Sequence, residues 1–455
     1  MKKRLWGICL LALMVFCAGC AASMPSETTT AATTQPVPTT EYVPREPVQP
    51  EWTEGSFSKN GAEVTTNSVL RTTDYLLLAD YGGAVVNPGY LLSYYVFDEN
   101  RNYLGTDGFL KSGEGFSLAK IREAYPEGVY FRVALDTVDQ TVLTPRHAAL
   151  SHVTFYGPGE AAPELPQTVS YENVAKMSAC QDGAIYDGKL FLFTAGGTCT
   201  VYDVRTGKKT GYIYFSSTSP LIPHANSVCF GNTFYAEGDK YPLLYANIYN
   251  NYTDRPDRME GTCCVFRLTE NGKFYNLDLV QVIRVGFAKD VDLWLSASGN
   301  SAPYGNFVVD TNHDKLYAYV MRNESNSTRF FEFDLPELTA GEYHEAYGCN
   351  VVTLGREDYD DMFDVDFSFF IQGGCYYDGK VISIEGMDSG SGKEPALRVI
   401  DLESGTLEAT YYLAEAGLFR EPEMISFDPD TGVLYYSGYD GHLRILHVPG
   451  LTETK

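Results

Sequence analysis

Five polar residues stand at the same place in five copies of a repeated segment. They are Gln181, His224, Tyr304, Gln372 and Glu421. Two residues further along, three of the copies carry Asn226, Asn306 and Glu423. Amide, imidazole and carboxyl groups beside a tyrosine suit hydrogen bonding to a neutral, hydroxyl-rich molecule. None of these residues is Lys or Arg, so we predict that they bind a neutral ligand such as a sugar.

The carboxyl groups of the same set could instead catalyse a reaction. Glycosidases place two carboxyl groups about 5–5.5 Å apart when they retain configuration and about 6.5–9.5 Å apart when they invert it. Glu421 or Glu423 would supply one group, and Asp182 the other if the first and last copies of the repeat meet. His224 and Glu421 could alternatively act as base and acid in a lyase or a cyclase.

Interpretations of these residues that involve no catalysis also remain open. A histidine at the start of a strand, such as His224, is often a hydrogen-bonded structural residue. Asn226 and Glu423, with backbone carbonyls, would suit a Ca²⁺ ion, but the sequence offers no complete ligand set, so we predict no cofactor. The acidic run at 357–361 is interpreted as a solvated loop, with a further carboxylate for the site as the alternative.

The repeat itself predicts the elements that position these side chains. Each copy runs from polar residues into alternating apolar ones and then into a turn, with Asp-Gly at 187–188 and 378–379. A second strand follows in each copy, as at 201–207 and 399–405. The spacing resembles bacterial β-propellers in general, whose blades take about 40–50 residues. This resemblance implies that the first strand of each blade lines a channel and that the second pattern is the third strand.

We therefore predict a β-propeller over residues 169–455. Copies begin at 181, 224, 304, 372 and 421, which indicates five blades. Two of the intervals are long, so six blades are the alternative if one interval hides another blade. One blade cannot bury both faces of its sheet, and a closed ring would complete the core.

A separate all-β domain is predicted for residues 53–157. Short strands are expected at 75–78, 90–97 and 128–134, with one helix at 117–124. Arg71-Thr72-Thr73-Asp74-Tyr75 and Tyr130-Phe131-Arg132-Val133 resemble motifs of small β-sandwich modules that stand beside hydrolase or adhesin domains in secreted bacterial proteins. The resemblance implies a β-sandwich or jelly roll that binds glycans, with a structural spacer as the alternative. A linker rich in Pro and Gly is expected at 158–168.

The N-terminal segment predicts a signal peptide, a membrane anchor and a stalk. Three basic residues precede an apolar run at 5–16, which is too short to span a membrane. Cys17-Ala18-Gly19-Cys20 resembles the lipobox of bacterial lipoproteins, although Cys17 replaces the usual Leu. The resemblance implies a signal peptide over 1–20, lipidation of Cys20 and a place on the outer face of the bacterial membrane. Residues 21–52 are rich in Thr and Pro, so we expect a disordered stalk.

Composition excludes one class of partner and indicates what the cysteines do. The formal net charge of −25 argues against nucleic acid, whose binding needs clustered Lys and Arg. Seven cysteines lie beyond the signal region, with no CxxC pair, and we interpret them as small core residues. A disulfide between Cys180 and Cys199 is the alternative, which an extracellular location permits. The seven are Cys180, Cys199, Cys229, Cys263, Cys264, Cys349 and Cys375.

Together these patterns predict an all-β surface lipoprotein, with an N-terminal β-sandwich or jelly roll followed by a five-bladed or six-bladed β-propeller. Its expected partners are membrane lipid, through acylated Cys20, and an extracellular glycan bound by the propeller mouth, the sandwich or both. One alternative function is a glycosidase or lyase that uses the carboxylates of the mouth. Another is a protein-interaction scaffold whose channel is inert.

Overall fold

The computed structural model describes residues 44–452, except 111–112, 139–141, 179, 197, 215–218, 251, 253–257, 273 and 301. The predicted signal peptide, Cys20 and most of the predicted stalk lie outside the described residues. Of the described residues, 45% lie in strands and 5% in helices, so the fold is all-β, as predicted. Among the described residues, no helix is long and apolar enough to cross a membrane.

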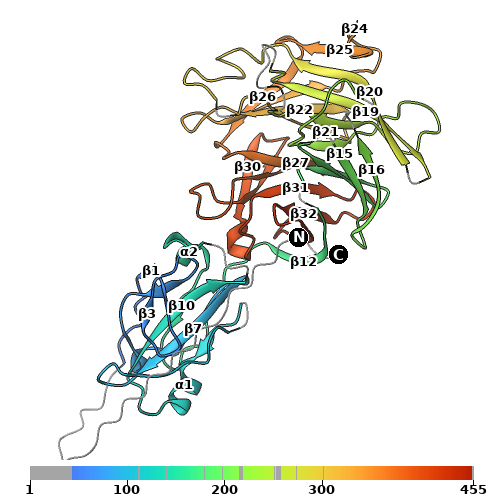
Figure 1. The fold of residues 1–455 in the computed structure, drawn as a ribbon. Helices are drawn as coiled ribbons and strands as arrows, with labels where there is room; N and C mark the ends of the chain where they lie inside the picture. The colour runs from blue at the N-terminus through green and yellow to red at the C-terminus, as the bar shows by residue number, and fades with distance from the viewer. Residues whose placement is uncertain are drawn as a thin grey trace, which may run out of the picture. The chain divides into compact units, whose positions relative to one another are not determined.

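Residues 52–156 form two larger sheets around one hydrophobic core (Figure 1). The first has the order β1 (Trp52–Glu54), β4 (Leu70–Thr72), β10 (Tyr130–Thr137), β7 (Tyr90–Phe97) and β8 (Tyr103–Gly105), with β5 (Leu76–Leu77) beside β10. The second has the order β11 (Thr154–Tyr156), β6 (Gly83–Val85) and β9 (Phe116–Ser117). Smaller elements are β2 (Ser56–Phe57), β3 (Glu63–Val64), η1 (Leu78–Asp80), α1 (Leu118–Ala124) and α2 (Arg146–Leu150).

Side chains from both of these sheets share that core. Leu92 and Phe131 from the first sheet and Ala84 and Phe155 from the second are all buried in one cluster. The predicted helix at 117–124 and the strand at 90–97 are confirmed as α1 and β7. The described end of the predicted stalk contacts this domain, because Gln49 Nε2 donates to the Phe155 carbonyl over 2.9 Å.

The two arginines of the predicted sandwich motifs have structural contacts. Arg132 is buried, and its guanidinium donates to the carbonyls of Thr72 and Thr73. Arg71 and Arg132 both bind the carboxylate of Glu63, at 2.7 Å and 2.6 Å. The hydrogen bond from Arg132 is the main cause that lowers the pKa of Glu63. Arg132 therefore joins β10 to β4 within the first sheet, and both arginines join that sheet to Glu63 of β3.

Residues 170–447 form five further sheets in the described part of the chain. From the innermost strand outward, the first sheet is β13 (Gly183–Tyr186), β14 (Lys189–Thr194), β15 (Thr198–Asp203) and β16 (Lys208–Tyr214). In the same direction, the second is β17 (Val228–Phe230), β18 (Leu244–Asn247), β19 (Thr262–Asn271) and β20 (Phe274–Val285), extended by β25 (Cys349–Leu354) and β24 (Glu342–His344). The third is β21 (Asn306–Asp310), β22 (Lys315–Met321), β23 (Thr328–Asp334) and β26 (Tyr359–Val365).

The last two sheets complete the set. One is β27 (Ile371–Tyr377), β28 (Lys380–Glu385), β29 (Ala396–Asp401) and β30 (Thr406–Tyr412), which is followed by η3 (Leu413–Ala416). The other is β31 (Pro422–Phe427), β32 (Leu434–Gly438), β33 (His442–His447) and β12 (Ser170–Lys176). β12 precedes all the other strands of this region in sequence but forms the outer edge of its last sheet.

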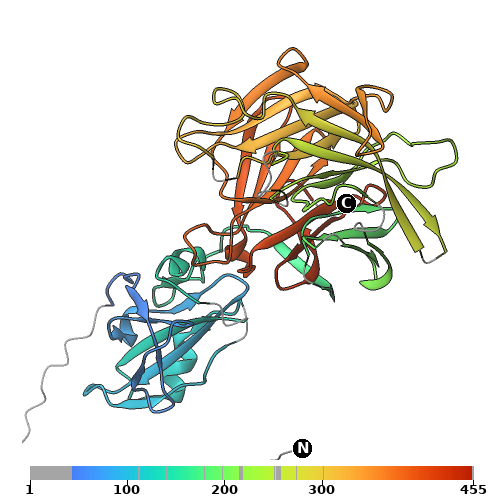
Figure 2. The same ribbon diagram turned by 45° about the horizontal axis from the view of Figure 1, so that its top comes forward.

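The innermost strands β13, β17, β21, β27 and β31 contact one another in a closed cycle, which is the arrangement of a β-propeller (Figures 1 and 2). These strands are largely buried, and every residue of β21 and β31 is buried. We call the end of the ring where these five strands begin the upper end, and the end where they finish the lower end. Hairpin turns after the innermost strands lie at the lower end.

The predicted strand positions within each copy are confirmed. Four of the repeat starts precede the innermost strands, and the remaining one, Gln372, is the second residue of β27. The second pattern falls on the third strands β15, β19, β23, β29 and β33. Both predicted Asp-Gly turns have left-handed backbones, with φ of 50° at Asp187 and 46° at Asp378. Such turns match the twist of a hairpin.

In the described residues, the strands within the two long intervals all belong to the five sheets. One contains the long hairpin of β19 and β20, seen in yellow-green in Figure 2. The other contains β24 and β25, and β25 pairs in parallel with β20. The acidic run was expected to be a loop, but it continues into strand β26, which pairs with β23. Exposed carboxylates suit that edge, because Asp360 and Asp364 pair with Lys315 and Arg329.

All seven cysteines beyond the signal region are buried and carry free thiols. Cys180 and Cys199 are therefore separate thiols in this structure, in agreement with the interpretation of small core residues.

Candidate functional site

The predicted ligand-binding residues lie at the upper end in two layers. Gln181, His224, Gln372 and Glu421 form the outer layer and are partly exposed. Below them Tyr304, Asn226, Asn306 and Glu423 are buried, with exposed fractions of 5%, 1%, 2% and 3%. We call the outer four residues together with Glu423 and Tyr304 the upper mouth.

One hydrogen-bonded chain crosses three of the five sheets in the upper mouth. His224 Nε2 lies 2.9 Å from Gln181 Oε1, and Gln181 Nε2 donates to Glu423 Oε2 over 3.2 Å. Burial lowers the pKa of His224, which favours the neutral imidazole. Burial, and then the neighbouring Glu421, Asp182 and Asp388, raise the pKa of Glu423 to about 9. Glu423 is thus a protonated acid at neutral pH.

Glu421 belongs to a second group of hydrogen-bonded residues, which lies beside this chain. Its carboxylate accepts a hydrogen bond from Gln372 Nε2, and its backbone N–H donates to Asp388 Oδ1 over 2.8 Å. Burial and the charge of Asp388 raise the pKa of Glu421. Asp388 also pairs with Arg420 at 3.0 Å, so a cation borders a mouth that the repeat pattern indicated to be free of Lys and Arg.

Tyr304 forms an aromatic side of the mouth. Its ring centroid lies 5.0 Å from that of Tyr249, whose ring lies 6.2 Å from His224. The Tyr304 hydroxyl accepts a hydrogen bond from Arg258 over 2.5 Å. The sequence pattern identified Tyr304 and His224, but Tyr249 and Arg258 stand outside the aligned positions.

Asn226 and Asn306 brace neighbouring sheets. Asn247 Oδ1 accepts the backbone N–H of Asn226, and Asn247 Nδ2 donates to Asn306 Oδ1 over 3.2 Å. The side chain of Asn226 donates to the Ile371 carbonyl over 2.7 Å. Their burial and these bonds give both residues a structural role beneath the mouth.

Asp182 lies deeper, at the centre of the ring. It is fully buried, and its two oxygens accept the backbone N–H groups of Val228 at 2.8 Å and Ile425 at 3.2 Å. Burial raises its pKa well above the usual range, opposed by backbone hydrogen bonds that include those of Gly183 and Gly374. One carboxyl group therefore ties together strands of four sheets and is committed to that contact.

No group of three or more His, Cys, Asp or Glu residues in the described ranges is arranged to hold a metal ion. Asn226 and Glu423, the side chains considered for Ca²⁺, have separate hydrogen-bond partners, the Ile371 carbonyl and the Gln181 amide.

A cavity of about 740 Å³ lies at the upper end, and its described lining contains none of the six mouth residues. Three aromatic side chains line it, Phe367, Phe369 and Phe370, together with Asn300 and the charged residues Glu324 and Lys393. Lys393 Nζ lies 3.8 Å from the centroid of the Phe370 ring, so in the described part of the chain Phe367 and Phe369 are the rings without a cation over them. Phe369 is 37% exposed. Gly386 links this upper cavity to the mouth, because its N–H donates to the Phe370 carbonyl and its carbonyl accepts from Gln372. The aromatic run just before Gln372 was a signal in the sequence, but the repeat alignment did not include it.

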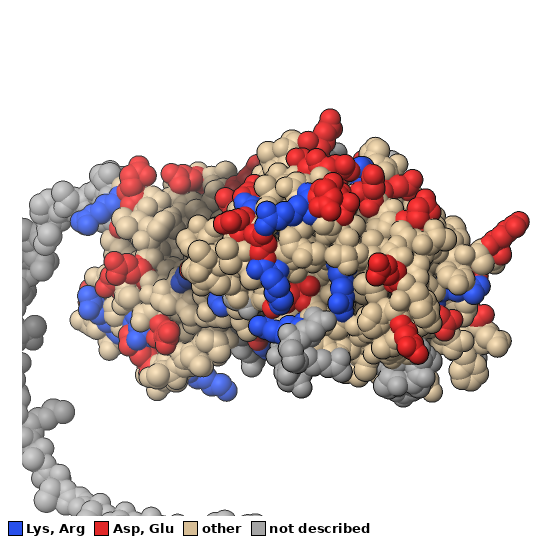
Figure 3. All heavy atoms as spheres, turned by 90° about the horizontal axis from the view of Figure 1, so that it is seen from above, with Lys and Arg blue, Asp and Glu red and all other residues tan. Residues whose placement is uncertain are grey.

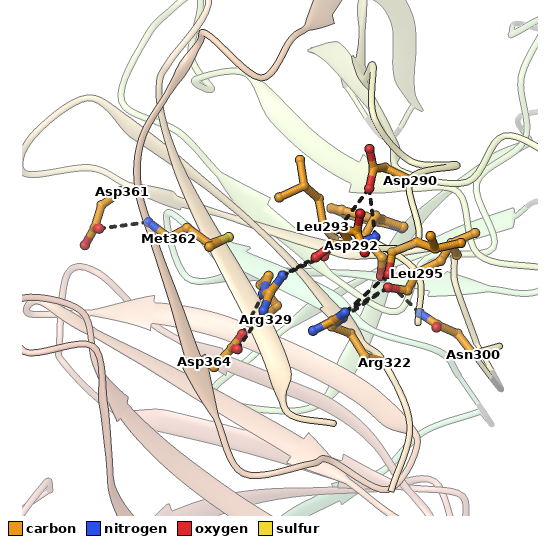
Figure 4. Close-up of polar contacts among 12 residues, drawn as sticks. Asp290, Asp292, Leu293, Leu295, Asn300, Arg322, Arg329, Asp361, Met362 and Asp364 are labelled. Carbon is orange, nitrogen blue, oxygen red and sulfur yellow. Dashed lines mark hydrogen bonds and ion pairs between the residues drawn. The ribbon is translucent and has the colours of Figure 1, made fainter. Parts of the chain in front are cut away.

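The walls of the upper cavity are fixed by polar contacts with backbone carbonyls (Figure 4). Arg322 donates to the Leu295 carbonyl over 3.1 Å, and Arg329 binds both Asp364 and the Asp292 carbonyl. Asn300 Nδ2 donates to the Met321 carbonyl over 2.9 Å. These bonds hold the loop that carries Ser298 and Asn300 against β22 and β23.

A second cavity, of about 610 Å³, lies at the lower end of the ring. All five innermost strands or the turns after them contribute to its lining, and none of the predicted mouth residues does. The repeat alignment directed attention to the starts of the inner strands, so this lower cavity was missed.

On the face shown in Figure 3, acidic side chains are frequent and a few Lys and Arg stand among them.

No family model matches the sequence, and no curated protein matches it. Solved structures with some similarity include the glutaminyl cyclase of Myxococcus xanthus, at 11% identity and a TM-score of 0.36, covering 62% of this chain and 95% of that one. A gluconolactonase of Xanthomonas campestris has 11% identity and a TM-score of 0.34, covering 64% and 98%. A putative glucose dehydrogenase of Thermus thermophilus has 12% identity and a TM-score of 0.35, covering 61% and 100%. These values assign neither a family nor an activity to the chain.

Proposed function

We propose that this protein binds extracellular carbohydrate at the upper end of its propeller. The observation that carries the proposal is the upper cavity, where three phenylalanine side chains lie among polar side chains, and where Gly386 connects Phe370 to Gln372 of the mouth. Aromatic faces stack on the apolar faces of sugar rings, and nearby polar groups orient the hydroxyls. The volume of about 740 Å³ is large enough for a short oligosaccharide.

Calorimetric titration of the full-length protein in detergent with a panel of oligosaccharides tests this proposal. Phe369→Ala should weaken binding about three- to tenfold, because an aromatic contact contributes about 0.5–1.5 kcal/mol. Phe274→Ala is the matched control, since Phe274 is 71% exposed on the hairpin of β19 and β20. Equal affinities in the two variants would remove the upper cavity from the site.

The proposed architecture has five blades, with one blade for each of the five sheets, and an N-terminal β-sandwich at residues 53–157. It is supported by the cycle of innermost strands and by β12, which adds the outer strand of the last sheet. Deletion of residues 169–176 should then abolish cooperative unfolding of the propeller, measured by circular dichroism in urea. An unchanged transition would contradict a ring closed by β12.

The proposed location is the outer face of a bacterial membrane, with lipid attached at Cys20. The support is the likeness of residues 17–20 to a lipobox. Metabolic labelling with palmitate and cell fractionation would test it. Labelled protein should appear in the membrane fraction, and Cys20→Ala should lose both the label and the membrane association.

Cleavage of the bound glycan is a second candidate function, favoured by the raised pKa values of Glu421 and Glu423. Carboxyl groups with raised pKa serve as general acids. Glu421 is the more accessible of the two, because Glu423 is only 3% exposed. Release of reducing ends from polysaccharides, lost in Glu421→Gln and kept in Phe274→Ala, would establish an enzyme.

A further inference from the structure

The lower cavity has aromatic walls from four of the five innermost strands or the turns that follow them. The six aromatic residues are Tyr186, Phe230, Phe234, Tyr376, Tyr377 and Phe427. Tyr377 and Phe427 are stacked with centroids 3.7 Å apart, and Tyr186 and Phe230 are tilted with centroids 5.3 Å apart. Phe234 is 43% exposed. Val228 and Val309 are buried among the lining residues and give the cavity an apolar floor.

Carboxylates surround this cavity, and two of them have basic partners, Asp187 with Lys240 at 3.0 Å and Asp310 with His313 at 2.9 Å. Asp378 is the one charged residue in the described lining, which contains no Lys or Arg. Further carboxylates act on the tyrosines of the wall. Burial, and then Asp430 and Asp187, raise the pKa of Tyr186, and Asp310 contributes to the raised pKa of Tyr376.

The amides at the rim are already engaged within the protein. Asn232 donates to the Thr311 carbonyl over 3.1 Å, and Asn312 donates to the Tyr376 hydroxyl over 2.9 Å. Few directed hydrogen bonds are therefore offered to a hydroxyl-rich ligand such as a sugar. The cavity instead offers π faces and carboxylates, and the faces of aromatic rings attract cations, most strongly when water is excluded.

We infer that the lower cavity binds a small organic cation of the quaternary ammonium class. The methyl groups would contact the aromatic walls, and the positive charge would be attracted by the ring faces and by Asp378. The volume of about 610 Å³ accommodates such a cation with a substituent attached. This site is distinct from the proposed carbohydrate site, since the two cavities lie at opposite ends of the innermost strands.

Choline and its neutral isostere 3,3-dimethylbutan-1-ol are the probes for this inference. Each is titrated into the full-length protein and followed by ligand-observed NMR. Choline is expected to bind with a Kd below about 1 mM, and the isostere at least tenfold more weakly, because only choline carries the charge. Absence of choline binding at 20-fold that concentration, or equal affinities of the two probes, would overturn the inference.

Two substitutions localise the binding. Tyr377→Leu should weaken choline binding about tenfold by removing one aromatic wall. Asp378→Asn should weaken it about threefold, and this variant should fold normally because Asn tolerates the φ of 46° at an exposed turn. Phe274→Leu, on a remote hairpin, should leave the affinity unchanged. Unchanged affinity in both cavity variants would show that choline binds elsewhere and would refute the site.

Discussion

The two ends of the ring differ in how their polar groups are used. At the upper mouth, His224, Gln181 and Glu423 bond to one another in a chain. At the lower end, aromatic rings and an aspartate surround open volume. Between the two ends, Asp182 joins strands of four sheets. Polar residues at equivalent repeat positions thus mark where sheets are tied together, while the cavities lie beside or opposite them.

This difference has a physical origin in the direction of the innermost strands. Every innermost strand begins at the upper end, where His224, Gln181 and Glu423 bond to one another and Gln372 bonds to Glu421. Each strand ends in a hairpin, and at this lower end large side chains line open volume. The mouth residues therefore bind the sheets to one another, and at each end the open volume lies outside this bonded set.

The largest expected loss of stability comes from removing the Asp182 carboxyl group, which lies between the two ends. Asp182→Ala leaves several buried backbone N–H groups without an acceptor, and each such loss costs about 1–3 kcal/mol. We expect the free energy of unfolding to fall by about 4 kcal/mol. Urea denaturation measures it, and Asp278→Ala on the exposed surface is the control. A loss as small as that of the control would mean that Asp182 does not hold the sheets.

The upper mouth should be sensitive to pH through Glu423. Its pKa in the folded protein is about 9, above the ordinary value of 4.5. The folded state therefore holds a proton that the unfolded state releases, so stability is full below pH 4.5 and declines as pH rises toward 9. Glu423→Gln should flatten this decline, and between pH 4.5 and pH 9 the variant should gain about 5 kcal/mol of stability relative to wild type. Parallel pH profiles of the two proteins would contradict the raised pKa.

Breaking the polar chain of the mouth should have a smaller effect. Gln181→Leu removes the partners of His224 and Glu423 and should lower the free energy of unfolding by about 1.5 kcal/mol. Gln167→Leu, at an exposed position in the linker, provides the control. Choline binding at the lower cavity should not change in Gln181→Leu, and a change would show that the two ends are coupled.

The repeat predicted the ring well, because Asp-Gly turns and alternating apolar residues are local signals of hairpins. It predicted the position of each innermost and third strand. It could not place β25, which joins β20 in parallel, since pairing between distant segments leaves no local pattern. The acidic run of β26 also escaped prediction, because an exposed outer strand lacks the buried face that marks the other strands.

The candidate site was predicted in part. The alignment found residues that the structure brings together, such as Gln181, His224 and Glu423. It could not distinguish Glu423 and Asp182, which are buried, from Gln372, which is partly exposed. Depth along a channel depends on how five sheets tilt and pack, and this is a property of the whole ring.

The smallest expected effect concerns the turns that form the rim of the lower end. Gly379 has φ of 78°, and a Cβ added there meets no atom within 4 Å, so substitution introduces only backbone strain. Gly379→Ala should lower the free energy of unfolding by about 1 kcal/mol, the usual cost of a left-handed L-residue. Gly196→Ala is the matched control, because its backbone is outside the left-handed region and the nearest atom lies 4.0 Å away. Equal unfolding midpoints in urea would mean that the turn relaxes freely, and a rim that relaxes could not hold Asp378 at a fixed distance from a bound cation.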